Sequence, residues 1–166
     1  MRSLAPLDEN PMRLSDILSE QRILVDVGGT LVRSKDMALV RLGAMLAPAV
    51  GVSDLEVHRL LLERENLQST GIGDGVAIPH ASTDDAPGQA AALVVSPSGI
   101  EFEAIDGAKV HIIFGVVGPR RATGEHLRTL ARISRLLRDP STRNRLISSV
   151  DAATAHQLVV TQDASL

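Results

Sequence analysis

The sequence predicts an α/β fold, a three-layer α/β/α domain with a central mixed β-sheet. Two β-branched, apolar runs at residues 89–96 and 109–117 are typical of strands buried on both faces. Segments with helical spacing of apolar residues lie before and after them, at 34–50, 53–66 and 123–139. Because each helix has only one apolar side, we expect the helices to cover the sheet.

The length of 166 residues favours one compact domain. Apolar residues make up 44% of the chain and charged residues 22%, as in ordinary globular proteins. We expect a single domain over residues 12–162. Residues 1–11 contain two prolines and no periodicity, which predicts a flexible N-terminal extension. The chain has no cysteine, which excludes disulfides and thiolate chemistry and fits a reducing compartment.

Charge and composition exclude further classes of protein. Seventeen basic and 20 acidic residues give a net charge of −3, and there is no Trp or Tyr, so we expect no nucleic-acid partner. No apolar run approaches the roughly 20 residues that span a bilayer, so we expect no membrane insertion. The N-terminus also lacks the apolar core of a secretory signal. These features predict a cytoplasmic protein.

Elements of the first half can be placed from caps and breakers. Residues 22–27 are predicted to form a short strand that ends in a Gly28-Gly29 turn. Ser34 is expected to cap the first long helix and Gly51 to stop it. The second helix begins with a Ser53–Glu56 capping box and runs to residue 66.

The second half begins with an extended segment at residues 75–81. After the two long strands, which are separated by a small alternation and a turn at residues 106–107, the pattern becomes helical. We expect Thr123 to cap the helix over 123–139 and Pro140 to end it. Two shorter helices, at 141–150 and 151–160, complete the chain.

The segment GIGDGVAIPH, residues 71–80, places three glycines before a proline and a histidine. It is not a dinucleotide or Walker motif, because the glycines follow a helix and no Gly-Lys-Ser/Thr is present. The five histidines show no metal-ligand spacing, and there is no Gly-X-Ser-X-Gly elbow. We therefore expect no metal and no cofactor, and the nucleophile that remains is the imidazole of His80.

A neutral imidazole is a good nucleophile, and phosphoryl transfer needs chiefly positioning and hydrogen-bond donors for the phosphoryl oxygens. Backbone N–H groups of the glycine-rich segment, at Gly73 and Gly75, are predicted to bind the phosphate together with one cation and one neutral donor. The hydroxyls of Ser82 and Thr83 are additional candidates.

Four sequence blocks, in their order along the chain, resemble the type-2 IIA proteins of the bacterial sugar phosphotransferase system. They are MRLSDIL, RENLQSTGIGDGVAIPHA, IEFEAIDGAKVHIIFGVVGP and ATGEHLRTLARISRLLRDP. This family comprises fructose, mannitol and nitrogen-regulatory members, and MRLSDIL is most like the opening of the nitrogen-regulatory ones. The resemblance covers nearly the whole chain from Met12. It implies the IIA fructose/mannitol-type fold for the domain.

The resemblance implies that His80 carries a phosphoryl group and that Arg64 and His126 support it. If Thr123 caps its helix, His126 lies in the first turn, where the helix dipole favours anions and a neutral ring. We expect a backbone carbonyl to hold one ring nitrogen of His80 so that the other can attack. The sequence does not show which nitrogen attacks.

The resemblance further implies an HPr/NPr-type phosphocarrier as the donor and regulation of target proteins, such as transporters or kinases, by phosphorylation state. Such a chain is a phosphoryl-transfer component rather than a free-standing enzyme. Two alternatives remain open: a IIA component of fructose- or mannitol-type sugar transport, and a regulatory module on the same fold that acts by binding alone. Eight arginines between residues 120 and 145 form either a solvated helix face or a docking surface for an acidic partner.

Overall fold

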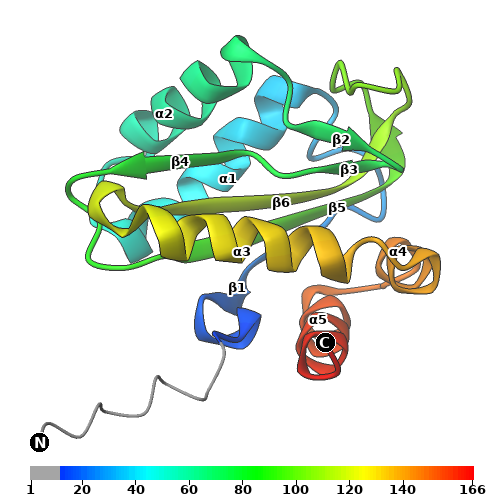
Figure 1. Ribbon diagram of the computed structural model, residues 1–166. Helices are drawn as coiled ribbons and strands as arrows, with labels where there is room; N and C mark the ends of the chain where they lie inside the picture. The colour runs from blue at the N-terminus through cyan, green and yellow to red at the C-terminus, as the bar shows by residue number, and fades with distance from the viewer. Residues whose placement is uncertain (1–11) are drawn as a thin grey trace, which may run out of the picture.

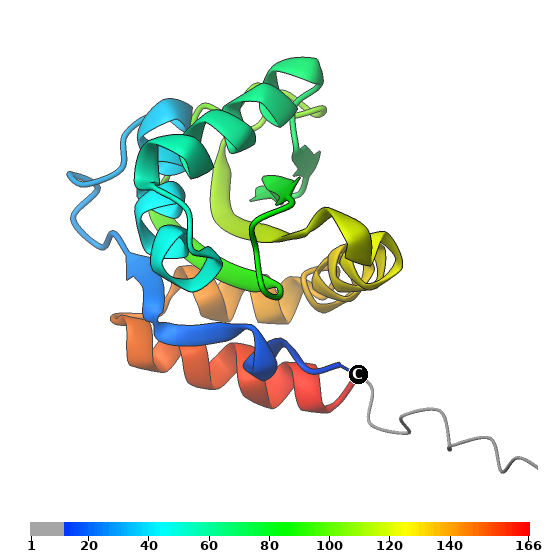
Figure 2. The same ribbon diagram turned by 90° about the vertical axis from the view of Figure 1, so that its left-hand side faces the viewer.

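The computed structural model describes residues 12–166, and the prediction for residues 1–11 lies outside this range. The described chain folds into three layers, with helices on both faces of a mixed sheet (Figures 1 and 2). The α/β/α prediction is therefore confirmed.

Six strands form the sheet of the described chain: β1 (Leu18–Val25), β2 (Gly71–Gly73), β3 (Val76–Ala77), β4 (His80–Thr83), β5 (Ala90–Ile100) and β6 (Val110–Pro119). Their order is β1-β5-β6-β3-β2, and β4 pairs with β6 beyond β3. β1 is parallel to β5, and both β3 and β4 are parallel to β6, whereas β5 and β6 are antiparallel. β3 and β4, the second of which begins with His80, therefore lie one after the other along the same edge of β6.

The helices are α1 (Lys35–Val50) and α2 (Asp54–Leu67) on one face of the sheet, and α3 (Thr123–Leu136), α4 (Pro140–Ile147) and α5 (Ala152–Ala164) on the other (Figure 2). Two short 3-10 turns, Leu14–Asp16 and Arg120–Ala122, precede β1 and α3. Figure 1 shows α3 running along the sheet from the end near β4 to α4.

The sequence of β6 is apolar at nearly every position because both faces of this strand are buried. Ile113 and Val117 pack into the core under α1 and α2, while Ile112, Phe114 and Val116 pack into the core under α3 to α5. At Gly115 the strand meets Leu42 of α1 so closely that a Cβ would lie 3.1 Å from its methyl carbons. Complete burial of a side chain such as Phe114 stabilises the fold by about 1.5–3 kcal/mol.

The last helix is tied to the rest of its layer by a buried carboxylate. Asp163 of α5 accepts hydrogen bonds from the backbone N–H of Leu14 (2.8 Å) and from Nε of Arg132 on α3 (2.5 Å). Because a buried charge is costly without partners, these bonds fix α5 against α3 and the turn at Leu14.

The predicted serine caps are confirmed at the first two helices, but the Ser53–Glu56 capping box is only half formed, because the Glu56 carboxylate binds Arg59 instead of the Ser53 N–H. Ser34 and Ser53 accept hydrogen bonds from the backbone N–H groups of Met37 and Glu56. Gly51 ends α1 with a left-handed φ of 71°.

Several predicted boundaries were wrong. The first strand lies at 18–25 rather than 22–27, because Asp26 leaves the strand and accepts hydrogen bonds from three backbone N–H groups of the following loop. The α3 helix ends at Leu136, and Pro140, predicted to end it, instead begins α4 with Asp139 as its cap. Proline suits that first position because its missing N–H would have no helical partner there.

Asp74 and Gly75 form a two-residue hairpin turn between β2 and β3. Both have positive φ, 56° and 76°, and the flanking residues Gly73 and Val76 are paired. A tight turn of this kind requires left-handed conformations at both central residues, which Asp-Gly supplies. No helix among residues 12–166 has the length and apolar character needed to cross a membrane.

Candidate functional site

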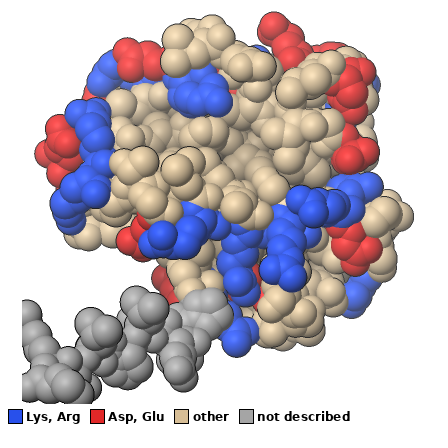
Figure 3. Space-filling model, viewed as in Figure 1, with Lys and Arg blue, Asp and Glu red and all other residues tan. Residues whose placement is uncertain are grey.

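A cleft of about 680 Å³ opens between the C-terminal half of α2, strand β4 and the beginning of α3. Figure 3 shows this region as a hollow with few charged side chains between α2 and α3. Its lining comprises Leu60, Glu63, Arg64, Asn66, Leu67, His80, Ala81, Ser82, Arg120 and His126. A smaller hollow adjoins it and shares Arg64 and His80. Four of the residues predicted from the sequence therefore meet in one place: His80, His126, Arg64 and Ser82.

His80 is the first residue of β4, and the chain before it fixes its ring. Pro79 interrupts the edge, its carbonyl accepts from the N–H of Val116, and the N–H of Ile78 donates to the carbonyl of Thr70. The carbonyl of Ile78 lies 2.7 Å from Nδ1 of His80. A carbonyl only accepts, so Nδ1 carries the proton and Nε2 keeps its lone pair. The expectation that a backbone carbonyl holds one ring nitrogen is confirmed.

The surroundings of His80 favour the neutral ring. Its side chain is partly buried, and this burial is the main cause that lowers its pKa. The hydrogen bond to Ile78 acts in the opposite direction, and the positive charge of Arg64 again lowers the pKa. The net pKa lies below the ordinary value, so the nucleophilic form of the ring predominates at neutral pH.

His126 stands beside His80, with ring centroids 5.6 Å apart and an interplanar angle of 52°. Its Nδ1 is buried and has no hydrogen-bond partner among the described residues. A buried donor without an acceptor is costly, which favours the tautomer with the proton on Nε2. That tautomer leaves an N–H donor for an anion in the cleft.

The helix start differs from the prediction. Ala122 is the N-cap of α3, and Thr123 is the first helical residue, whose hydroxyl donates to the carbonyl of Arg120. His126 nevertheless lies in the first turn, where the helix dipole disfavours a positive ring. Burial, followed by the charge of His80, lowers the pKa of His126.

Arg64 lies in the last turn of α2 and lines both hollows that His80 lines. Its Nη1 donates to the carbonyl of Gln68 at 2.9 Å, which satisfies one of the free carbonyls at the end of the helix. The other guanidinium donors have no partner among residues 12–166, so they are free for an anion in the cleft.

The next residue, Glu65, anchors the end of α2. It is 3% exposed and accepts from the N–H and the hydroxyl of Thr70 and from Nζ of Lys35. Burial opposes its ionisation, but these hydrogen bonds prevail and lower its pKa. Since Thr70 in turn binds Ile78, the anchor connects the Arg64 helix to the segment that holds His80.

The remaining predicted residues divide between the cleft and the scaffold. Ser82 lines the cleft. Thr83 is buried, and its hydroxyl accepts from the N–H of Asp85. Gly73 and Gly75 line neither hollow of His80, and a Cβ at Gly75 would instead lie 3.2 Å from the ring of His111.

Sequence reasoning did not assign Arg120 to the cleft. It follows β6 directly and pairs with Asp84 at 3.0 Å, close to the end of β4. The parallel pairing of β4 with β6 aligns Thr83 with Pro119, so Arg120 lies at the end of the strand that His80 begins, and both residues line the cleft. The sequence shows a cation immediately after a long buried strand. Arg120 can be assigned to the cleft only once it is known that β4 lies next to that strand.

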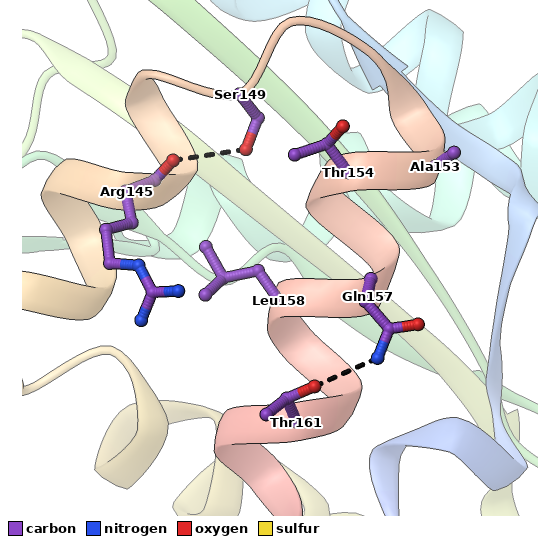
Figure 4. A pocket seen from close by; sticks show the side chains of 7 residues that line it. All are labelled: Arg145, Ser149, Ala153, Thr154, Gln157, Leu158 and Thr161. Carbon is purple, nitrogen blue, oxygen red and sulfur yellow. Dashed lines mark hydrogen bonds between the residues drawn. The ribbon is translucent and has the colours of Figure 1, made fainter.

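A second hollow of about 500 Å³ lies between α4 and α5, away from His80 (Figure 4). Several of its polar groups are satisfied within the layer. Ser149 donates to the carbonyl of Arg145, and Gln157 donates to the hydroxyl of Thr161.

The other three histidines contact groups outside the cleft: Asp36 for His58, the carbonyl of Ser96 for His111 and the carbonyl of Leu18 for His156. Within residues 12–166, no cluster of three or more His, Asp or Glu side chains has the arrangement of a metal site. The cleft thus combines one nucleophilic nitrogen, one neutral ring donor and cationic donors, which suits a transient phosphoryl group.

Residues 16–161 match the family described as "Phosphoenolpyruvate-dependent sugar phosphotransferase system, EIIA 2". The chain belongs to this family, which supports a phosphocarrier role.

Within the family the chain is similar to nitrogen regulatory proteins. That of Bradyrhizobium diazoefficiens is 34% identical over 148 residues, which are 89% of this chain and 95% of the relative. That of Pseudomonas aeruginosa is 35% identical over 150 residues, 90% and 96% of the two chains. The crystal structure of nitrogen regulatory protein IIA-Ntr from Neisseria meningitidis superposes with a TM-score of 0.81 at 31% identity, over 88% of this chain and 98% of that one. The resemblance inferred from the four sequence blocks is confirmed.

Proposed function

We propose that this chain is a phosphohistidine carrier of a nitrogen-related phosphotransferase system in the cytoplasm. It accepts a phosphoryl group on Nε2 of His80 from an HPr/NPr-type phosphocarrier and regulates target proteins according to its phosphorylation state. The observation that carries the proposal is the 2.7 Å contact between Nδ1 of His80 and the carbonyl of Ile78, which leaves Nε2 as the nucleophile.

Transfer exchanges one P–N bond for another. The lone pair on Nε2 of His80 forms a bond to phosphorus while the P–N bond of the carrier's phosphohistidine breaks and its electron pair returns to the carrier's ring, which carries a proton on its other nitrogen and so becomes neutral. The His80 ring becomes positive, and its Nδ1 proton stays on the nitrogen, where the Ile78 carbonyl stabilises it. No external acid or base is required.

The neighbouring groups support the phosphoryl oxygens. Arg64 supplies charge-assisted hydrogen bonds, and His126 supplies a neutral N–H donor. Two rings and one guanidinium would repel one another if both rings were protonated, so the lowered pKa values keep the cleft ready for an anion. The hydroxyl of Ser82 is a further donor in the lining.

Phosphorylation changes the surface that a target meets. A phosphoryl group adds nearly two negative charges and three acceptor oxygens to a cleft that previously held neutral and cationic side chains. A target that binds through this cleft therefore distinguishes the two states.

The test is phosphorylation of the purified protein with phosphoenolpyruvate, the first enzyme of the system and the phosphocarrier. We expect one acid-labile phosphate per chain, with a ³¹P NMR signal of an Nε2-phosphohistidine. The His80→Ala variant should take up none, whereas His58→Ala, which alters a ring outside the cleft, should be labelled like the wild type. Label that survives His80→Ala would refute the assignment.

A further inference from the structure

An ion pair outside the cleft lies next to Arg64 in the chain. Nζ of Lys35, the first residue of α1, is 3.0 Å from Oε1 of Glu65, whose side chain is completely buried. A buried ion pair stabilises a fold no better than apolar side chains of similar volume, because both charges lose their hydration. The presence of a charged pair at this position therefore points to a role other than stability.

The second oxygen of Glu65 closes the loop that follows α2. Oε2 accepts hydrogen bonds from the backbone N–H of Thr70 at 2.9 Å and from its hydroxyl at 2.5 Å. Within this closed loop, the carbonyl of Gln68 accepts from Nη1 of Arg64 at 2.9 Å. The position of the Glu65 carboxylate therefore determines where the loop holds the guanidinium of Arg64.

The same loop is connected to the ring of His80. The carbonyl of Thr70 accepts from the N–H of Ile78 at 3.0 Å, and the carbonyl of Ile78 lies 2.7 Å from Nδ1 of His80. The guanidinium of Arg64 and the imidazole of His80 are thus both placed by hydrogen bonds that begin at Glu65.

Lys35 is itself held by the connection between β5 and β6. Its Nζ lies 5.3 Å from the centroid of the Phe102 ring, within the range of a cation–π contact, and 3.8 Å from a carboxylate oxygen of Glu103. The hydroxyl of Ser69 donates to the carbonyl of Phe102, which ties the loop after α2 to the same connection. Lys35 therefore joins three segments: the start of α1, the end of α2 and the β5–β6 connection.

We propose that Lys35 is a positioning residue for phosphoryl transfer, acting through Glu65. The pair fixes the guanidinium of Arg64 relative to Nε2 of His80. This inference rests on the proposed function of His80. Neither Lys35 nor Glu65 lines the cleft, so the pair acts through residues that do. A misplacement of about 1 Å at a reacting group can slow a reaction about 10²-fold, so a network that prevents it affects the rate without touching the phosphoryl group.

The test measures single-turnover transfer from the purified, phosphorylated carrier over a range of carrier concentrations. In Lys35→Met the buried carboxylate loses its cation, so we expect the rate at saturating carrier to fall about tenfold. The half-saturating carrier concentration should stay within twofold, because the residues that line the cleft are unchanged. Lys35→Arg keeps the charge and should remain within threefold of the wild type.

The matched control is Lys109→Met, which removes the other lysine of the chain. Lys109 is exposed, lines neither hollow of His80 and has no ion pair among residues 12–166. Its loss changes the net charge equally and should leave the rate within twofold of the wild type.

A second measurement distinguishes positioning from a loss of stability. In a protein that already carries Arg64→Ala, Lys35→Met should slow transfer less than twofold further, because no guanidinium is left to position. Urea unfolding of the same proteins shows whether each is folded under the assay conditions. If Lys35→Met does not fold, Glu65→Gln replaces it in both backgrounds, since it removes the charge but keeps the shape of the side chain. Its expected loss is about threefold with Arg64 present.

The outcomes separate this inference from the proposed function. If the wild type takes up no phosphate at His80, the proposed function fails and this inference fails with it. If the wild type transfers but folded Lys35→Met is within twofold of it, the positioning role is wrong while the carrier role stands. The same conclusion follows if Lys35→Met costs an equal factor with and without Arg64, or if Lys109→Met loses as much as Lys35→Met.

Discussion

Two hollows of the described chain are similar in size, about 680 Å³ around His80 and 500 Å³ between α4 and α5, but they differ in what their side chains do. Around His80, two rings with lowered pKa values and a guanidinium converge, and one buried ring nitrogen has no partner among the described residues. Between α4 and α5, Ser149 and Gln157 donate to neighbours within the same layer (Figure 4). Volume alone therefore does not identify a functional site, whereas convergent groups with shifted pKa values do.

The difference has a structural origin. The His80 cleft lies where an interrupted strand, the end of one helix and the beginning of another meet, so the chain presents helix ends and a free strand edge there. The α4–α5 hollow lies between two helix sides, whose backbone groups are already bonded. The His80 cleft can therefore bind a ligand through groups at the ends of helices and strands, which the α4–α5 hollow lacks.

Among variants that keep His80, Arg64→Ala is expected to have the largest effect. If the guanidinium binds the phosphoryl oxygens during transfer, its loss should slow transfer about 10²-fold, as for other preorganised donors to a transition state. Single-turnover transfer from the phosphorylated carrier measures this rate. Arg145→Ala removes a guanidinium from the other hollow and should change the rate less than threefold. Equal rates for both variants would remove the functional distinction between the hollows.

The His126→Ala variant should slow transfer about fivefold, since one neutral hydrogen bond contributes about 1 kcal/mol and each 1.4 kcal/mol is a factor of ten. His126→Gln keeps an N–H donor in the first turn of α3 and should recover part of the rate. The same single-turnover assay measures both. A His126→Ala protein as fast as the wild type would mean that this ring only fills space beside His80.

The Gly75→Ala variant should lower the free energy of unfolding by about 1–2 kcal/mol, because alanine resists the left-handed φ of 76° and its Cβ meets the His111 ring. Urea unfolding measures the loss. Transfer at His80 should stay within threefold. Gly88→Ala, at a position with open space around the new Cβ, should leave stability nearly unchanged. A slower transfer with unchanged stability would instead place Gly75 in the phosphate site.

The fold was largely predictable because its signals are local. Each signal is contained within a single element of the chain. The signals are the apolar runs of β5 and β6, the serine caps of α1 and α2 and the helical spacing of apolar residues in α1 to α3. The errors lie at boundaries where the next segment of the chain takes over residues from the end of an element. Asp26 leaves β1 to bind the following loop, and α3 ends before Pro140 because Asp139 and Pro140 already begin α4.

The candidate site was predictable only in part. His80, Arg64 and His126 came from sequence motifs and are brought together by the fold, whereas the glycines between Arg64 and His80 shape the β2–β3 hairpin. Arg120 could not be assigned, because its place depends on β4 pairing with β6 over a separation of 36 residues. Residue types with a local conformational need, such as glycine, are easily mistaken for ligand contacts when the sequence alone is available.

The pH dependence of stability should show the same contrast between the hollows, with a smaller effect whose sign follows from burial. Burial lowers the pKa of both His80 and His126 in the folded protein, so the unfolded chain binds more protons. Stability is therefore fully present above the unfolded value of about 6.5 and falls as the pH drops below it toward the folded values. Urea unfolding between pH 5 and 7.5 measures this slope, which should be reduced in His80→Gln/His126→Gln and retained in Gln157→Ala. A double variant with the wild-type slope would show that the cleft does not hold its two rings neutral, and the distinction between the two hollows would then have to rest on Arg64 alone.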